Sequence, residues 1–236
     1  MKKKIISIAL IGTAISACIV FFLNLNVTTK QCIDYRCHAI QLPLYLKTLD
    51  FFDRHFNYKQ LVKKIIQDAK NDEERALKIF SWTYNNIKRN PEGLPIMDDH
   101  VWYTIVRGYG VDDQFQDVFT TLCHYAGLDA FFDLLPSEKD KEIKPLSFVK
   151  LGDDWFIFDA YNGVYFKNAR GKMASVKDLS SGDWQIVSLS RNELPNYRDY
   201  FQNLNSINYR NYRSSRAALQ SPLNRLIFWK ESKDKK

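Results

Sequence analysis

A thiol and an imidazole stand side by side at Cys123 and His124. A cysteine thiolate activated by a neighbouring base is a common nucleophile in group-transfer reactions. Adjacent residues on a helix point to different sides, however, and Cys123 falls on the apolar stripe of a predicted helix. We therefore predict that Cys123 is a small buried hydrophobic residue without a catalytic role.

His100 is a second candidate, because it follows Asp98 and Asp99. An imidazole beside carboxylates can bind a metal ion or transfer a proton. Residues of these types also cap and turn loops, which is their more frequent role. The four cysteines include no C-x-x-C pair, which excludes zinc-ribbon and thioredoxin-like motifs. We predict neither a metal site nor a cofactor.

Two helices are predicted in the first half of the chain. Apolar residues recur with helical spacing from Leu61 to Ala69, with lysines on the opposite side. Asn71 provides an N-cap for the next helix, which begins with acidic residues and ends at Asn90-Pro91. Residues 24–50, ahead of both helices, are expected to form an irregular connector.

A third helix is predicted over residues 112–126. Asp112 and Asp113 stand where an N-cap belongs, and apolar residues follow with helical spacing. Gly127 stands where a left-handed residue commonly ends a helix. This helix therefore has both a start signal and a stop signal.

Beyond this helix the pattern changes to the two-residue period of β-strands. The predicted strands are residues 130–134, 146–151, 155–159, 164–166 and 184–187. The second and third of them form a hairpin around Gly152. Helices followed by antiparallel strands predict an α+β fold.

The N-terminus has the pattern of a membrane signal. An uncharged run of 19 residues, Ile5–Leu23, follows three lysines. At about 1.5 Å per residue the run matches the roughly 30 Å hydrocarbon core of a bilayer. The lysines indicate that the N-terminus is inside and the rest of the chain is outside the cytoplasmic membrane. We predict an uncleaved single-pass anchor. A lipoprotein signal cleaved at Cys18 and an ordinary cleaved signal peptide stay open as alternatives.

Two cysteines follow this run, Cys32 and Cys37. Outside the membrane thiols oxidise, and a C-x4-C pair can close a small loop. The two residues therefore either form a disulfide or remain unrelated thiols next to the membrane.

Composition and charge narrow the classes of partner. The 236 residues are 45% hydrophobic and 26% charged, which excludes a disordered chain. Without Lys2, Lys3 and Lys4 the 34 basic residues fall to 31, against 27 acidic residues. Because this small excess is spread along the chain, we expect no nucleic-acid partner. Residues 196–216 are rich in Tyr, Asn and Arg, and are either a helix packed on the domain or a docking surface.

Three stretches of the chain carry a resemblance to a known family. Residues 76–87 resemble a helix that precedes a catalytic segment, residues 110–130 a nucleophile helix with its exit, and residues 146–159 two strands with catalytic positions. Together they are similar to the transglutaminase-like (papain-like cysteine protease) superfamily. The resemblance implies that family's α+β core, with N-terminal helices packed on an antiparallel β-sheet, here behind a single N-terminal transmembrane helix.

These expectations divide the chain into four parts. They are a membrane anchor or signal segment at 1–27, a connector at 28–55, a transglutaminase-like domain at 56–195 and a Tyr/Arg-rich C-terminal extension at 196–236.

The family's chemistry uses a Cys–His–Asp triad, and the resemblance places three residues of this chain at those positions. Asp112 stands where the cysteine belongs, Leu146 where the histidine belongs and Asp159 where the aspartate belongs. Leucine cannot act as a base, and a carboxylate is a far poorer acyl-transfer nucleophile than a thiolate. The resemblance therefore implies a degenerate member that lacks thiol-dependent catalysis.

Several functions remain open at this stage. The leading hypothesis is an inactive binding or assembly module at the bacterial cell envelope, whose partner is a polysaccharide or another protein. The link to surface polysaccharide rests on the resemblance of residues 158–166 to proteins of such pathways. The alternative is a hydrolase or acyl-transferase in which Asp112 and Asp159 face each other and act as acid and base. In a third reading, the C-terminal extension is the docking surface of an assembly subunit.

Overall fold

The computed structural model describes residues 2–98, 100–191 and 193–233, so Asp99 lies outside it. The α-helices are α1 (Lys2–Leu23), α2 (Leu44–Ile65), α3 (Asp72–Asn86), α4 (Val101–Arg107), α5 (Asp112–Tyr125), α6 (Val176–Ser181) and α7 (Pro222–Lys233). The strands are β1 (Asn26–Ile33), β2 (Arg36–Pro43), β3 (Lys88–Arg89), β4 (Met97–Asp98), β5 (Tyr109–Gly110), β6 (Ala130–Pro136), β7 (Ile143–Leu151), β8 (Asp154–Asp159), β9 (Val164–Asn168) and β10 (Trp184–Ser188). The 3-10 helices are η1 (Tyr197–Asp199), η2 (Phe201–Ser206), η3 (Tyr209–Ser214) and η4 (Ala218–Gln220). Helices precede an antiparallel sheet, which confirms the predicted α+β class.

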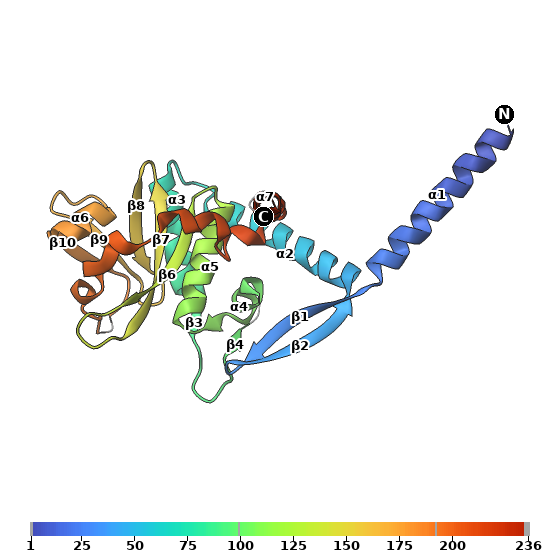
Figure 1. Cartoon of the computed structure of the whole chain (residues 1–236). Coiled ribbons are helices and arrows are strands. Elements are labelled where there is room, and N and C mark those ends of the chain that lie inside the picture. Colours follow the sequence, from blue (N-terminus) through green and yellow to red (C-terminus); the bar gives the residue numbers. More distant parts are fainter. Residues whose placement is uncertain (1, 99, 192, 234–236) are drawn as a thin grey trace.

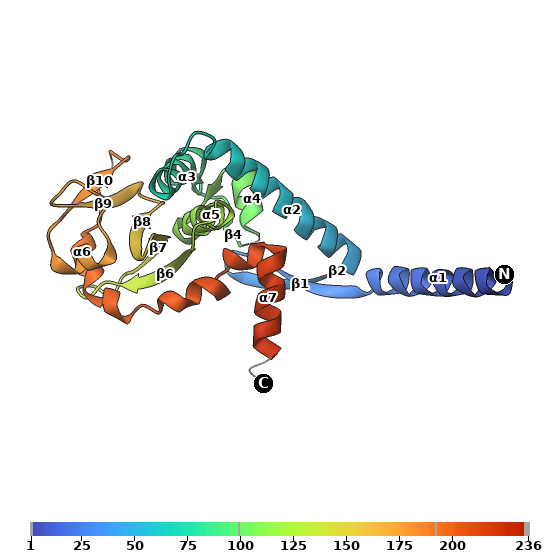
Figure 2. The ribbon, with the colours of Figure 1, turned by 90° about the horizontal axis from the view of Figure 1, so that it is seen from above.

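Helix α1 projects away from the rest of the molecule as a straight rod (Figures 1 and 2). Within the part of the chain that the structure describes, no helix combines the length and the apolar character needed to cross a bilayer. Side chains are described only from Leu10 onward, so the first side chains of the predicted run Ile5–Leu23 are not among them.

The prediction of an irregular connector over residues 24–50 is wrong. Those residues form the β1–β2 hairpin and the beginning of α2, which starts at Leu44, well before the helical spacing that begins at Leu61. The hairpin turn is made by Asp34 and Tyr35, whose φ angles are 47° and 63°. Because this turn contains no glycine, the sequence lacks the usual hairpin signal. Cys32 and Cys37 lie opposite each other at the closed end and form a disulfide.

The centre of the molecule is a five-stranded antiparallel sheet with strand order β10-β9-β8-β7-β6. The predicted hairpin is present as β7 and β8, in a register that pairs Ser147 with Phe158. Alternate residues of a strand point to opposite faces, so Leu146 and Ser147 face different sides of the sheet. That alternation decides which residues meet α5.

Helix α5 covers one face of the sheet and is itself covered by α2 and α3 (Figure 2). Its buried residues Phe115, Phe119 and Leu122 pack in one cluster with Val149 and Phe158 of the sheet. Burying one side chain of this size contributes about 2–3 kcal/mol relative to leaving it exposed. Gly127 ends the helix with a φ of 85°, as predicted.

The opposite face of the sheet is covered by the C-terminal segment. Tyr197, Phe201 and Leu204 pack on Phe148 and Phe166 in a second buried cluster. The sequence predicts, in one alternative, that residues 196–216 are a helix packed on the domain. The packing is confirmed, but the segment consists of 3-10 helices in place of a regular α-helix. Its many Asn and Ser side chains compete for backbone hydrogen bonds, which disfavours a continuous α-helix.

Candidate functional site

Asp159 lies at the end of β8 and is completely buried. Its Oδ1 accepts hydrogen bonds from the Asn162 backbone N–H at 3.0 Å and from Gln116 Nε2 at 3.4 Å. Its Oδ2 accepts hydrogen bonds from Asn162 Nδ2 at 2.8 Å and from the Tyr197 hydroxyl at 2.7 Å. Lys144 Nζ lies 3.3 Å from the same oxygen. Both carboxylate oxygens are therefore occupied by protein donors.

Gln116, one turn into α5, connects this carboxylate to the sheet. Its Oε1 accepts a hydrogen bond from Ser147 Oγ at 2.7 Å and another from the Ala160 N–H at 3.2 Å. Gln116 and Ser147 are both completely buried. Because buried amides and hydroxyls are costly unless they are hydrogen-bonded, this network fixes α5 against β7 and β8.

Asp112 lies in the first turn of α5. It is not the N-cap, so the predicted capping role is wrong. The N-cap is Val111, whose N–H donates to Gln114 Oε1 at 3.2 Å, while Asp112 Oδ1 accepts from the N–H of Asp113 at 2.9 Å. Glutamine at the third helical position can satisfy the N-cap N–H, which leaves Asp112 free of that task.

Leu146 is completely buried in the second cluster, on the face that the C-terminal segment covers. Lys144 projects to the same face as Leu146, since the two are two positions apart on β7. Ser147 points to the other face and toward α5, as its bond to Gln116 shows. The residue next to α5 is therefore Ser147, and Leu146 is a packing residue.

The facing arrangement of Asp112 and Asp159 stays a prediction. In the described part of the chain, no hydrogen bond joins these two carboxylates, and each has its own separate partners. The assignment of Asp112, Leu146 and Asp159 to the three triad positions stays a prediction. The two residues that complete the surroundings of Asp159, Asn162 and Tyr197, carried no signal in the sequence, because neither belongs to the pattern of the family's triad.

The remaining thiol and imidazole candidates do not form a catalytic pair. Cys123 is completely buried, and burial raises the pKa of its thiol well above the usual value. Burial lowers the pKa of His124, which lies beside Asn224 of α7. Among the described residues, no group of three or more His, Cys, Asp and Glu side chains could hold a metal ion.

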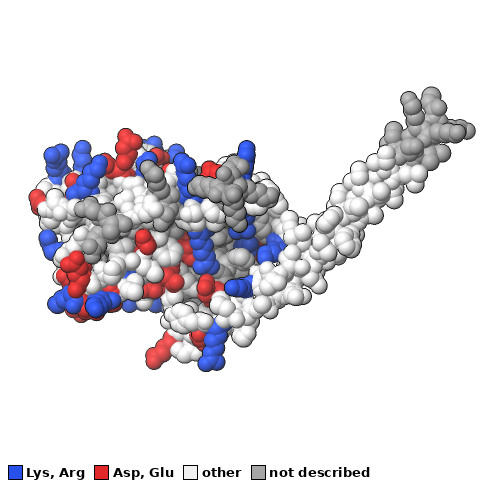
Figure 3. All heavy atoms as spheres, viewed as in Figure 1, with Lys and Arg blue, Asp and Glu red and all other residues white. Residues whose placement is uncertain are grey.

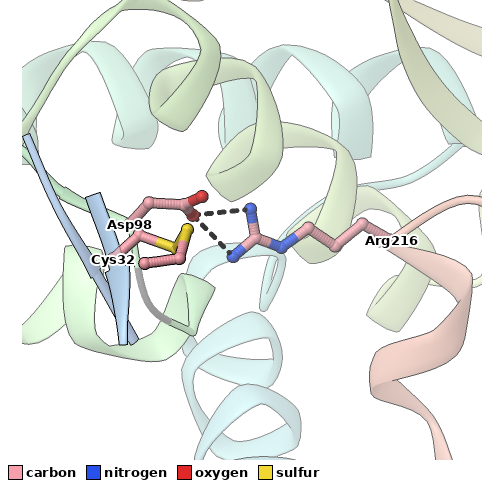
Figure 4. The surroundings of a disulfide bond; sticks show 4 residues. Cys32, Asp98 and Arg216 are labelled. Carbon is pink, nitrogen blue, oxygen red and sulfur yellow. Dashed lines mark hydrogen bonds and ion pairs between the residues drawn. A yellow bond between two sulfur atoms is a disulfide. The ribbon is translucent and has the colours of Figure 1, made fainter. Parts of the chain in front are cut away.

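A second charged cluster joins α5 to the C-terminal segment. Arg216 lies 2.8 Å from Asp117 Oδ2 and 3.3 Å from Asp98 Oδ1, next to the disulfide of Cys32 (Figure 4). Burial raises the pKa of Asp117 to about 7, although the charge of Arg216 opposes the shift. Desolvation therefore outweighs the ion pair at this carboxylate.

Comparison with known proteins finds one family that the central part of the chain resembles. Residues 59–170 match the model of the transglutaminase-like superfamily. No curated protein matches the chain.

Three solved structures resemble the chain at low identity. A proposed cysteine protease from Cytophaga hutchinsonii is 19% identical with a TM-score of 0.39, over 59% of this chain and 53% of that one. A proposed protease from Parabacteroides distasonis is 15% identical with a TM-score of 0.37, over 52% of this chain and 28% of that one. A structure described as a TGase is 11% identical with a TM-score of 0.39, over 74% of this chain and 54% of that one. The alignments thus span about half of two of these chains and less of the third.

Proposed function

We propose that this protein, in which residues 59–170 form a domain of the transglutaminase-like superfamily, is a catalytically inactive member that serves as a binding or assembly module at a bacterial cell envelope. Its partner would be a cell-envelope polysaccharide or another protein. The proposal rests on the chemistry of the residues around Asp159 and on the sequence of the N-terminus.

The main support for the proposal is the set of side chains that contact Asp159. In a working triad the aspartate orients a histidine, and the histidine activates the nucleophile. The described side chains that contact Asp159 are two amides, one phenol and one ammonium, and none of them is an imidazole. A carboxylate bound in this way stabilises the fold and has no free lone pair directed at a base.

The hydrolase alternative, based on Asp112 and Asp159, is less well supported. Two carboxylates share acid and base roles when they are close enough to drive their pKa values apart. Within the described residues no hydrogen bond links Asp112 to Asp159, and the Asp159 side chain is completely buried with protein donors on both of its oxygens.

The location at the cell envelope is supported by three features. Three lysines precede the apolar run Ile5–Leu23. The described part of α1 has no charged side chain and stands out from the charged body (Figure 3). The Cys32–Cys37 disulfide is typical of an oxidising compartment. Together they favour a single-pass protein of the cytoplasmic membrane with its domain on the extracytoplasmic side.

A covalent-trapping experiment tests the inactivity. The full chain is incubated with a glutamine-containing peptide ester or with iodoacetamide, and intact-mass spectrometry follows adducts. We expect no acyl adduct, and alkylation of Cys123 only after unfolding in urea, because that thiol is buried. An acyl group on Cys123, or rapid alkylation of Cys123 in the folded protein, would overturn the proposal.

A further inference from the structure

A large cavity lies away from Asp159, between the β1–β2 hairpin, α2, α4 and the C-terminal segment. Its volume is about 810 Å³. Cavities of roughly 300–1,000 Å³ commonly hold small molecules. Neither Asp112, Leu146 nor Asp159 lines this space, so a ligand there would be independent of the triad positions.

The cavity is lined by more basic than acidic side chains. Its charged lining consists of Lys30, Lys47, Arg216, Arg225, Asp50 and Asp98. Both carboxylates are already engaged, because Asp50 binds Arg54 and Tyr103 while Asp98 binds Arg216. The basic side chains therefore leave a net positive potential inside the cavity.

Two of these cations have donors without a protein acceptor. Within the described residues, no hydrogen bond or ion pair engages the Lys30 ammonium. Arg225 donates from Nε to the Leu219 carbonyl at 3.1 Å and lies over the Phe51 ring, and the described chain offers its two terminal nitrogens no acceptor. Terminal guanidinium nitrogens form a fork that suits carboxylate and phosphate groups.

The pKa values of two nearby basic groups are lowered, which agrees with this positive potential. Burial, followed by the charge of Arg54, lowers the pKa of His100 to about 4, with Arg216 and Arg225 contributing. Burial and Arg54 also lower the pKa of Arg225. His100 is consequently neutral at pH 7 and can add a hydrogen bond to a ligand without adding charge.

Part of the wall formed by the hairpin and the start of α2 is apolar. Ile40, Leu42 and Leu46 line the cavity there, and Ile40 and Leu46 are still 41% and 44% exposed. The hairpin follows α1 directly, and the Leu44 N–H donates to the Leu25 carbonyl at 2.9 Å, so this wall lies next to the exit of α1. A hydrocarbon segment would bury the exposed apolar area.

We propose that this cavity binds an anionic amphiphile, with its carboxylate or phosphate head at Lys30, Arg225 and His100 and its hydrocarbon segment against Ile40, Leu42 and Leu46. The inference goes beyond the proposed binding role, because its ligand is neither a polysaccharide nor a protein. The shared chemistry is an acidic head on an apolar chain, whether a free fatty acid or a phospholipid supplies it.

Calorimetry on the full chain, held in phosphatidylcholine nanodiscs with empty nanodiscs as the blank, tests the proposal. The probes are octanoate, octyl phosphate and the neutral octanamide. We expect at least one anion to bind about tenfold more tightly than octanamide, since a charge-assisted hydrogen bond is roughly twice as strong as a neutral one. Tighter binding of octanoate would indicate a fatty acid, and tighter binding of octyl phosphate a phospholipid.

Two substitutions in the cavity and one matched control complete the test. Lys30→Gln and Arg225→Gln should each weaken the preferred anion about tenfold, whereas Lys63→Gln, on α2 outside the cavity, should leave it unchanged. Lys30→Gln removes no internal partner and is the variant that keeps the fold intact. Equal binding of octanamide, equal binding by Lys30→Gln, or no binding of either anion would overturn this site. Those results would leave the inactive triad positions untouched, because the covalent-trapping experiment tests them separately.

Discussion

The hydroxyl of Tyr197 donates a 2.7 Å hydrogen bond to Asp159 Oδ2, so the C-terminal segment binds the buried carboxylate at the end of β8. Burial, and the negative charge of Asp159, raise the pKa of Tyr197, which therefore remains a donor. A segment outside the region that matches the family model thus completes the surroundings of a residue inside it.

Replacing Tyr197 with Phe tests that contact. The ring can still pack on Phe166 and Phe201, but Asp159 loses a donor in a buried site. We expect Tyr197→Phe to lower the free energy of unfolding by about 1–2 kcal/mol in urea titrations followed by tryptophan fluorescence. Tyr35→Phe is the control, since Tyr35 is 83% exposed, and it should change stability by less than about 0.5 kcal/mol. Equal effects of the two variants would show that the contact contributes nothing.

Substituting Gly163, with Gly152 in another turn as the matched control, tests the turn that holds Asn162 against Asp159. Gly163 has a φ of 65°, and a Cβ there would lie 2.7 Å from the Tyr84 ring, whereas Gly152 has a φ of 63° and open space around it. Gly152→Ala should therefore cost about 1 kcal/mol from backbone strain alone. Gly163→Ala adds a steric clash worth about 1–3 kcal/mol more. Thermal unfolding of both variants gives the comparison, and a Gly163→Ala protein as stable as Gly152→Ala would contradict the packing described here.

The raised pKa of Asp117 predicts a pH dependence. Between about pH 4 and its folded pKa of about 7, the folded protein retains a proton that the unfolded chain releases, so the free energy of unfolding falls as pH rises. Each pKa unit corresponds to about 1.4 kcal/mol. The substitution Asp117→Asn removes this pH-dependent contribution to the free energy of unfolding. His100, whose pKa is lowered to about 4, acts in the opposite direction but is present in both proteins.

The measurement is the free energy of unfolding of wild type and Asp117→Asn from pH 4 to pH 8. Relative to wild type, the variant should gain stability steadily across this range and level off above pH 7. A difference that is flat, or that falls with pH, would show that Arg216 holds the Asp117 carboxylate ionised.

The proposed topology can be checked with a single engineered thiol. In a Cys18→Ser background, Lys139→Cys lies in an exposed loop after β6 and should react with a membrane-impermeant maleimide on intact cells. Lys3→Cys, on the other side of the proposed anchor, should react only after lysis. Labelling of Lys139→Cys that also requires lysis would contradict an extracytoplasmic domain.

The elements with complete local signals were predictable from sequence. Asn71 caps α3 through the Glu74 N–H, Gly127 ends α5, and the β7–β8 hairpin has the expected strands. Each depends on a capping residue, a glycine or a two-residue period that acts within a few positions. The β1–β2 hairpin has none of these turn signals and could not be found in this way.

The surroundings of Asp159 depend on contacts that are distant in sequence. Gln116 lies 43 positions from Asp159 and Tyr197 lies 38 positions from it. On a predicted amphipathic helix, Gln116 reads as one polar residue among apolar ones, and Tyr197 as part of a polar tail. Only the tertiary fold reveals that both bind the same carboxylate.

Turnover by the full chain is the most direct test of an inactive transglutaminase-like domain. The assay follows incorporation of a fluorescent amine into a glutamine peptide, and release of product from a peptide amide, for wild type, Cys123→Ala and Asp159→Asn. We predict that all three proteins match the blank, with and without reducing agent, because Asp112 cannot form a thiolate and Leu146 cannot act as a base. Product formed by wild type and abolished by Cys123→Ala or Asp159→Asn would contradict the account.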